Sequence, residues 1–81
     1  KMERYDEAVE AFKRSAELEE APRYIDNWDS VGQIYEMQHK WEEAAQAYEQ
    51  VLVIYKADWQ STEGFYVEQY RQKVLYCRAK A

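Results

Sequence analysis

The sequence has few of the residues that bend or cross-link a chain. Its 81 residues include one cysteine, one proline and two glycines. A single cysteine excludes an internal disulfide framework and a zinc site built from several cysteines. Because β-hairpin turns draw heavily on glycine and proline, their scarcity argues against a β-sandwich or barrel. The sequence therefore favours one small domain of packed helices.

Long apolar runs are missing as well. No stretch reaches the ~18 apolar residues that a membrane-spanning helix needs, and no basic start followed by an apolar stretch indicates a secretory signal. We therefore expect no membrane partner and a cytoplasmic location, in the sense of an intracellular one that includes organelles. Because the chain opens on Lys1 rather than on methionine, we also expect a piece of a longer protein.

Aromatic residues, in contrast, are abundant. Eight tyrosines, three tryptophans and two phenylalanines make up 16% of the residues, which indicates dense helix packing or a binding surface. The formal net charge is −5, yet residues 61–81 carry four basic and two acidic side chains. The end of the chain is therefore basic on an otherwise acidic protein.

Hydrophobic residues recur at helical spacing in four segments, which predicts helices over about 2–20, 25–38, 40–57 and 62–80. Pro22 ends the first segment, and Ser61 or Thr62 is placed to cap the last. The link between the second and third helices is so short that they must be antiparallel neighbours. Gly32 lies within the second helix at a cost of up to ~1 kcal/mol relative to alanine, which predicts a close approach by another backbone.

Several side chains invite a functional reading beside a structural one. Cys77 lies on the apolar face of the last helix, where we expect a buried small residue; the alternative is a reactive thiol whose pKa is lowered by Lys73 and Arg78. His39 has no partner at metal-ligand or catalytic spacing, so we expect an exposed turn residue. Aromatic residues expected in the core are Tyr5, Phe12, Trp28, Tyr35, Trp41 and Tyr48.

One pattern occurs twice in the chain. Residues 5–12 (YDEAVEAF) align with residues 41–48 (WEEAAQAY) at an offset of 36 residues, and in both an alanine precedes an aromatic residue by about one turn. At this point the sequence resembles the tetratricopeptide repeat family, whose pattern is W-x2-L-G-x2-Y…A-x3-F…P. Six positions match it: Trp28, Val31, Gly32, Tyr35, Ala44 and Tyr48. Lys56 stands where the family has proline. The long period is also similar to that of long-repeat relatives such as NSF-attachment-protein-like and kinesin-light-chain-like arrays.

The resemblance implies an all-α fold in which antiparallel helix-turn-helix hairpins form a right-handed array of four helices. In this reading residues 1–81 are a partial array. Residues 2–21 are the second helix of a first repeat, residues 25–58 are a complete repeat, and residues 61–81 are either the first helix of another repeat or a closing helix.

The family binds partners on its concave face, and the resemblance implies that this face includes Asp26, Asp29, Ser30, Gln33, Glu36 and Met37. Relatives that clamp acidic chaperone tails have lysine and asparagine where this chain has Asp29 and Gln33. We therefore expect a protein-interaction module, a scaffold or adaptor, whose partner is basic or amphipathic. Further contacts with a partner are expected from Tyr24, Trp59, Phe65, Arg71, Lys73 and Tyr76.

No constellation of residues supports catalysis, so we expect no enzyme activity, no cofactor and no metal. The basic last helix is read as a solvated flank of a soluble helix rather than as a surface for nucleic acid, lipid or an acidic protein.

An alternative function is structural. Fewer than three full repeats leave apolar ends uncovered, so the chain could be a self-assembling part of a larger repeat protein that dimerises or swaps helices. A concentration series in analytical ultracentrifugation separates the two readings. Self-assembly predicts a mass that rises with concentration, and a monomer throughout contradicts it.

Overall fold

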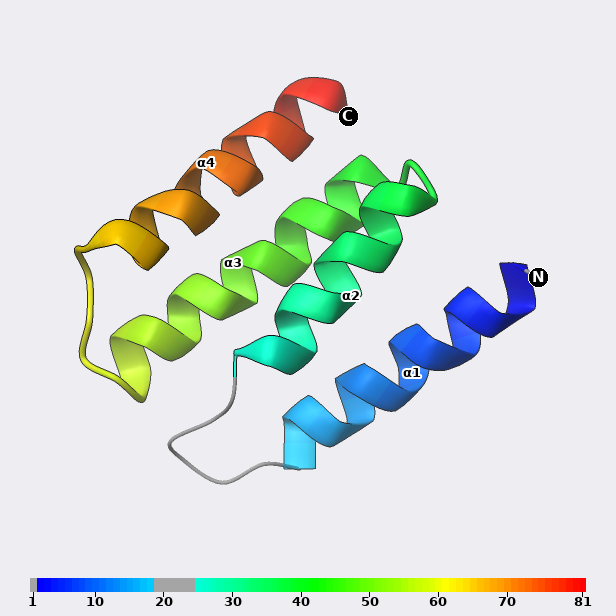
Figure 1. Cartoon of the computed structure of the whole chain (residues 1–81), viewed down its shortest axis with the longest axis horizontal. Helices are drawn as coiled ribbons and strands as arrows, with labels where there is room; N and C mark the ends of the chain where they lie inside the picture. The colour runs from blue at the N-terminus through cyan, green and yellow to red at the C-terminus, as the bar shows by residue number, and fades with distance from the viewer. Residues whose placement is uncertain (1, 19–24) are drawn as a thin grey trace.

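The chain folds into four helices arranged in sequence order. The structure is a computed structural model that describes residues 2–18 and 25–81, with side chains from residue 4. Its helices are α1 (Met2–Leu18), α2 (Asp26–Met37), α3 (Trp41–Ala57) and α4 (Phe65–Lys80). Each helix packs against the one before it and runs in the opposite direction (Figure 1). The predicted all-α class is thus confirmed, and the described residues contain no strand. The expected helix break at Pro22 lies outside them.

A short turn joins α2 to α3 and ends α2 in a well-defined way. The amide of Lys40 donates to the carbonyl of Tyr35 at 2.8 Å, and that of His39 donates to Glu36 at 3.0 Å. Together with the left-handed backbone of His39 (φ 60°), these two bonds form a Schellman motif, which satisfies the last carbonyls of the helix. His39 is exposed, as expected, and its ring stacks on Trp41 with centroids 5.6 Å apart.

The core lies along α2, α3 and the inner side of α4. Tyr35 and Tyr48 are buried as expected, whereas three of the predicted core aromatics are only partly buried against this cluster: Phe12, Trp28 and Trp41. Tyr5 is 38% exposed, so its prediction as a core residue is wrong. The reason is that, in the described part of the chain, α1 packs mainly against α2, so its early residues receive little cover from a further helix.

The contact between α2 and α3 depends on Gly32. A Cβ atom at this position would lie 2.6 Å from Cε1 and Cζ of Tyr48, far inside van der Waals contact. The glycine therefore makes room for an aromatic ring, rather than for a backbone as the sequence had suggested. Tyr48 is fully buried in this contact.

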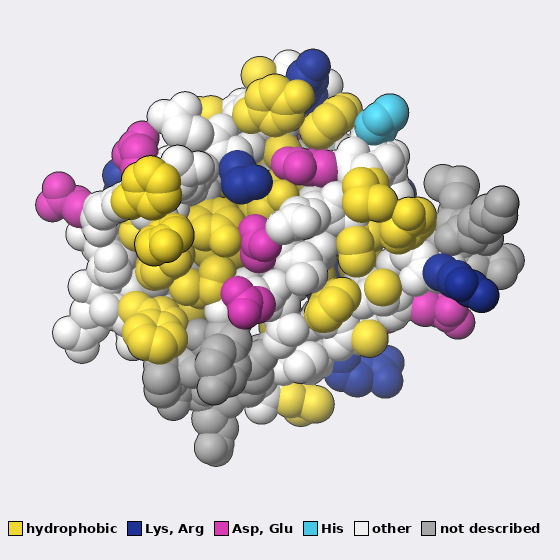
Figure 2. Space-filling view, viewed as in Figure 1, with side chains coloured by type: hydrophobic (Ala, Val, Ile, Leu, Met, Phe, Trp, Pro, Cys, Tyr) yellow, Lys and Arg dark blue, Asp and Glu magenta, His cyan; other side chains and the backbone are white. Residues whose placement is uncertain are grey.

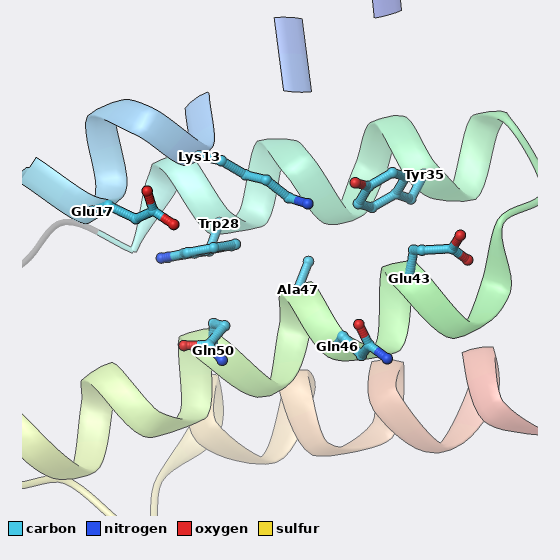
Figure 3. Close-up of a pocket in the computed structure, with 8 residues that line it drawn as sticks. All are labelled: Lys13, Glu17, Trp28, Tyr35, Glu43, Gln46, Ala47 and Gln50. Carbon is cyan, nitrogen blue, oxygen red and sulfur yellow. The ribbon is translucent and has the colours of Figure 1, made fainter. Parts of the chain in front are cut away.

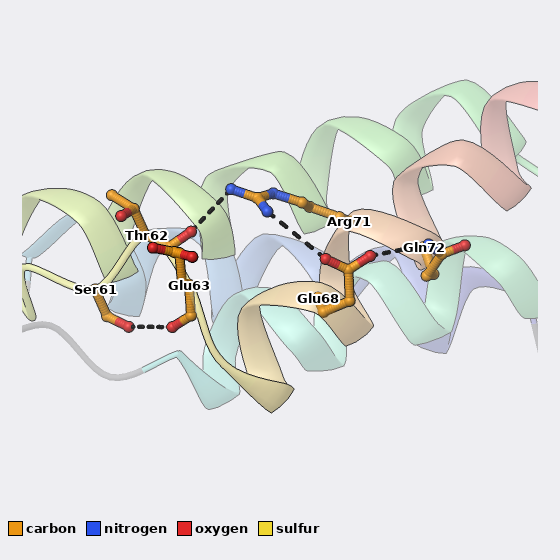
Figure 4. Close-up of polar contacts among 6 residues, drawn as sticks. All are labelled: Ser61, Thr62, Glu63, Glu68, Arg71 and Gln72. Carbon is orange, nitrogen blue, oxygen red and sulfur yellow. Dashed lines mark hydrogen bonds and ion pairs between the residues drawn. The ribbon is translucent and has the colours of Figure 1, made fainter.

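The connection from α3 to α4 differs from expectation. Neither Ser61 nor Thr62 caps the last helix, whose N-cap is Gly64 with no side-chain hydrogen bond. The Ser61 hydroxyl donates to the Glu63 carbonyl, and the Thr62 carbonyl accepts a bond from Arg71 at 2.8 Å (Figure 4). The helix starts at Phe65, after Gly64, whose φ of 125° and ψ of 172° lie in a region open essentially only to glycine. These loop contacts fix where α4 begins.

The fit between Gly32 and Tyr48 yields a stability prediction. Gly32→Ala adds up to ~1 kcal/mol of helix propensity, but overpacking a close-packed core costs about 1–3 kcal/mol, so we expect a net loss of about 1 kcal/mol. Urea unfolding followed by circular dichroism measures it. In a Tyr48→Leu background, which lacks Cε1 and Cζ, Gly32→Ala should be neutral or stabilising. An equal loss in both backgrounds would contradict the proposed clash.

Candidate functional site

The acidic face of α2 lies opposite α4. Asp26, Gln33 and Met37 are exposed there, and Asp29, Ser30 and Glu36 are partly buried. A hollow at one end of this face is lined by residues of α2, α3 and α4: Gln33, Glu36, Met37, Trp41, Lys73 and Tyr76. We call the surface between α2 and α4 the α2–α4 groove. Its α2 wall is the helix face that carries the six predicted residues. On the α4 wall, Lys73 and Tyr76 line the hollow, Tyr70 bonds to Asp29, and Tyr66 lies close to Tyr55 together with Asp26 and Asp29.

One hydrogen bond joins the two walls here, and another, within α2, fixes the orientation of the carboxylate that accepts it. The hydroxyl of Tyr70 donates to Oδ1 of Asp29 at 3.0 Å, while Nε2 of Gln33 donates to Oδ2 of the same carboxylate at 2.7 Å. Asp29 is thereby held in one orientation. Burial, followed by the nearby Asp29 charge, raises the pKa of Tyr70 well above the usual range, so this tyrosine remains a neutral donor.

The Tyr48 side chain lies beneath the same region. Burial raises the pKa of its hydroxyl, and the charges of Glu36 and Asp29 add to this effect. No hydrogen-bond partner meets this hydroxyl among the described residues, although the Glu36 carboxylate is close to it. The ammonium of Lys73 lies 5.1 Å from the centroid of the ring, within reach of a cation–π interaction.

Cys77 is buried, as the structural reading expected. Its thiol donates to Oε2 of Glu36 at 3.6 Å, forming the second contact between α4 and α2. Burial and then the Glu36 charge raise the pKa of Cys77 to about 11, which outweighs the opposing effect of Lys73. Arg78 instead pairs with Glu49 at 2.7 Å. The alternative of a reactive thiol with a lowered pKa is therefore wrong, because desolvation acts in the other direction.

The residues predicted as extra contacts lie in different settings. Trp59, Phe65 and Tyr76 are 48%, 70% and 53% exposed, and Tyr24 lies outside the described residues. Arg71 holds the loop before α4 through Thr62 and pairs with Glu68 at 3.6 Å (Figure 4). Of the predicted extra contacts, Lys73 and Tyr76 therefore reach the α2–α4 groove, whereas the guanidinium of Arg71 is engaged locally.

The sequence reading missed an aromatic area in the groove. Tyr66 on α4 is 65% exposed. The ring of Tyr70 lies 6.2 Å from that of Tyr55 at the end of α3. A spacing of four residues between Tyr66 and Tyr70 was visible in the sequence, but their position opposite Asp26 and Asp29 depends on how α4 packs.

A second hollow lies between α1 and α3, over α2. It has a volume of about 200 Å³ and is lined by Lys13, Glu17, Trp28, Tyr35, Glu43, Gln46, Ala47 and Gln50 (Figure 3). In the close-up the Lys13 side chain reaches toward Tyr35, and its ammonium lies 5.3 Å from that ring. This aromatic surface of α2 therefore already has a cation from α1 beside it.

No group of three or more His, Cys, Asp or Glu side chains in the described part of the chain could hold a metal ion. Among the described helices, none has the length and apolar character to cross a bilayer. No family model, curated protein or solved structure gave a significant match to the chain. The resemblance to tetratricopeptide repeats therefore stays a prediction.

The raised pKa of Cys77 predicts a loss of stability in alkali. The thiol titrates near 9.0 when unperturbed and at about 11 in the folded chain. Above pH 9 the unfolded chain loses this proton while the folded chain keeps it, so the free energy of unfolding falls as pH rises toward 11. By pH 11 the thiol should account for on the order of 2 kcal/mol of this fall in the free energy of unfolding, because each pKa unit of difference between the two states corresponds to ~1.4 kcal/mol.

Urea unfolding at several pH values between 8 and 11, with a reducing agent present, measures this slope. The Cys77→Ala variant is the control, because it keeps the contributions of Tyr48 and Tyr70 and loses that of the thiol. Its slope should be shallower than that of the natural chain. Identical slopes would show that Cys77 ionises normally in the folded state.

Proposed function

We propose that the chain is a protein-interaction module that holds a basic or amphipathic segment of a partner in the α2–α4 groove. The observation that carries the proposal is the pairing of an acidic wall on α2 with an exposed aromatic wall on α4. Asp26, Asp29 and Glu36 supply three negative charges to this groove, whereas Lys73 supplies one positive charge. A cationic segment would gain from this imbalance, and an acidic one would be repelled.

Aromatic exposure supports a partner that also brings apolar side chains. Tyr66 and Tyr76 are each more than half exposed on the α4 wall, and Met37 on α2 is 60% exposed. Side chains of this kind are enriched in protein interfaces because they offer a large contact area. An amphipathic helix laid in a groove presents apolar and charged side chains together, which suits this mixture.

A designed peptide pair tests the proposal. The probe is an 18-residue amphipathic helix of leucine and lysine carrying a fluorescent label, and its counterpart has glutamate in place of each lysine. We expect the lysine peptide to bind, with an affinity that falls as salt is raised, and the glutamate peptide to bind at least tenfold more weakly. Fluorescence anisotropy at two or more salt concentrations measures both.

Matched variants locate the binding surface. Asp29→Asn with Glu36→Gln removes two charges from the groove, and Glu7→Gln with Glu10→Gln removes two exposed charges from α1. Partly exposed ion pairs are worth about 0.5–1 kcal/mol each, so the loss of two should weaken binding about fivefold to thirtyfold. The α1 pair should change it less than twofold. If both pairs weaken binding equally, attraction to the net charge explains it and the groove assignment is wrong.

A further inference from the structure

Three tyrosines converge on the first turn of α2. The ring of Tyr70 lies 6.2 Å from that of Tyr55 at an angle of 45°, and its hydroxyl bonds to Asp29. Tyr66 lies one turn before Tyr70 on α4 and is mostly exposed. Figure 2 shows a hollowed hydrophobic area between α4 and the start of α2, with acidic side chains at its edge. We call Tyr55, Tyr66, Tyr70, Asp26 and Asp29 the tyrosine–aspartate site.

The electrostatic environment of this site is negative. Burial raises the pKa of Tyr55, and the hydroxyl of Tyr66 and the carboxylates of Asp26 and Asp29 raise it further. The Tyr55 hydroxyl is therefore influenced by Tyr66 from α4 and by two carboxylates from α2. The start of α2 contributes roughly half a positive charge, which the two carboxylates exceed. A cation placed here would meet carboxylates and the negative faces of aromatic rings.

Three tyrosines outside this site have a cation near the ring. Tyr35 has Lys13 and Lys40 near its ring, Tyr48 has Lys73, and Tyr76 has Lys80, all with the ammonium 5.1–5.9 Å from the ring centroid. Within residues 4–18 and 25–81, no lysine or arginine lies over Tyr55, Tyr66 or Tyr70. The tyrosine–aspartate site has the same ring chemistry together with two carboxylates, and no lysine or arginine of the described residues lies over its rings.

We propose that the tyrosine–aspartate site binds the guanidinium of an arginine side chain from the partner segment. The inference rests on the proposed function and names the residue type that the groove selects. A guanidinium is planar, stacks on aromatic rings and donates in a fork that fits a carboxylate, whereas an ammonium does only part of this. Asp29 is already oriented by Tyr70 and Gln33, so binding requires little reorganisation of the site.

The probe is N-acetyl-arginine amide, titrated into the full chain and followed by the aromatic NMR resonances of the tyrosines. We expect the resonances of Tyr55, Tyr66 and Tyr70 to shift with a dissociation constant in the millimolar range, as a few weak contacts allow. N-acetyl-citrulline amide has the same shape without the charge and should not bind. N-acetyl-lysine amide should bind at least twofold more weakly. Equal binding of either amide would overturn the proposal.

Two variants and two controls assign the contacts. Asp26→Asn and Tyr66→Leu alter exposed members of the site and should each weaken arginine amide binding about threefold, the size expected for one exposed charge or cation–π contact. Glu7→Gln and Tyr5→Leu make the same chemical changes at exposed positions on α1, outside the site and the groove, and should leave binding within the error of the titration. Shifts that spread equally over Tyr5, Tyr76 and the site, or that survive both site variants, would overturn the assignment.

The outcome is separable from that of the proposed function. If the leucine–lysine peptide binds in the groove but arginine amide leaves the three tyrosines unmoved, the groove stands and the arginine site is wrong. If arginine amide binds at the site but the peptide does not bind, the site stands as a local cation site and the proposed function fails.

Discussion

The structure depends on the packing of the Tyr48 ring against Gly32. This contact lets α3 approach α2 so closely that one ring occupies the place of a Cβ atom, and it puts the Tyr48 hydroxyl beside the carboxylates of α2. Helix α4 then packs on α3, and its inner residues reach Asp29 and Glu36. The width of the α2–α4 groove is therefore set by a glycine and a tyrosine that do not belong to its predicted binding residues.

The acidic residues of α2 have two roles that are usually separate. Asp29 and Glu36 accept hydrogen bonds from Tyr70 and Cys77, so they position α4. They also remain only partly buried, so their charge still reaches the groove. Each donor keeps its proton because burial and the adjacent carboxylate raise its pKa, and a neutral donor beside a charged acceptor gives a stronger bond than two neutral groups.

Local sequence patterns predicted the bounds of the helices better than they predicted which side chains pack against one another. Helical spacing placed α2 and α3 to within one residue at each end. The reason is that the spacing of hydrophobic residues and the short turn between the helices both depend on residues that are close together in the sequence. The start of α4 was missed because Gly64 and the Arg71 contact with Thr62 override the caps that Ser61 and Thr62 offered. Tyr5 was misplaced for a different reason, since burial depends on whether a further helix lies opposite. Six candidate residues on α2 followed from the family resemblance, but their pairing with Tyr70 and Cys77 needed the packing of α4.

The tyrosines of the fold differ in which charged groups lie near their rings. The rings of Tyr35, Tyr48 and Tyr76 each have a lysine ammonium within cation–π distance. The lysine comes from a neighbouring helix or from the same helix, so the cation is supplied by the chain itself. At the junction of α4 with the start of α2, rings meet carboxylates instead. Negative ring faces and negative carboxylates gain nothing from each other, so this arrangement relies on the hydrogen bond from Tyr70 to Asp29 and on the contacts of the Tyr70 ring with Tyr48 and Tyr55. No cation of the described residues lies over these rings, which is the physical reason for proposing a cationic partner there.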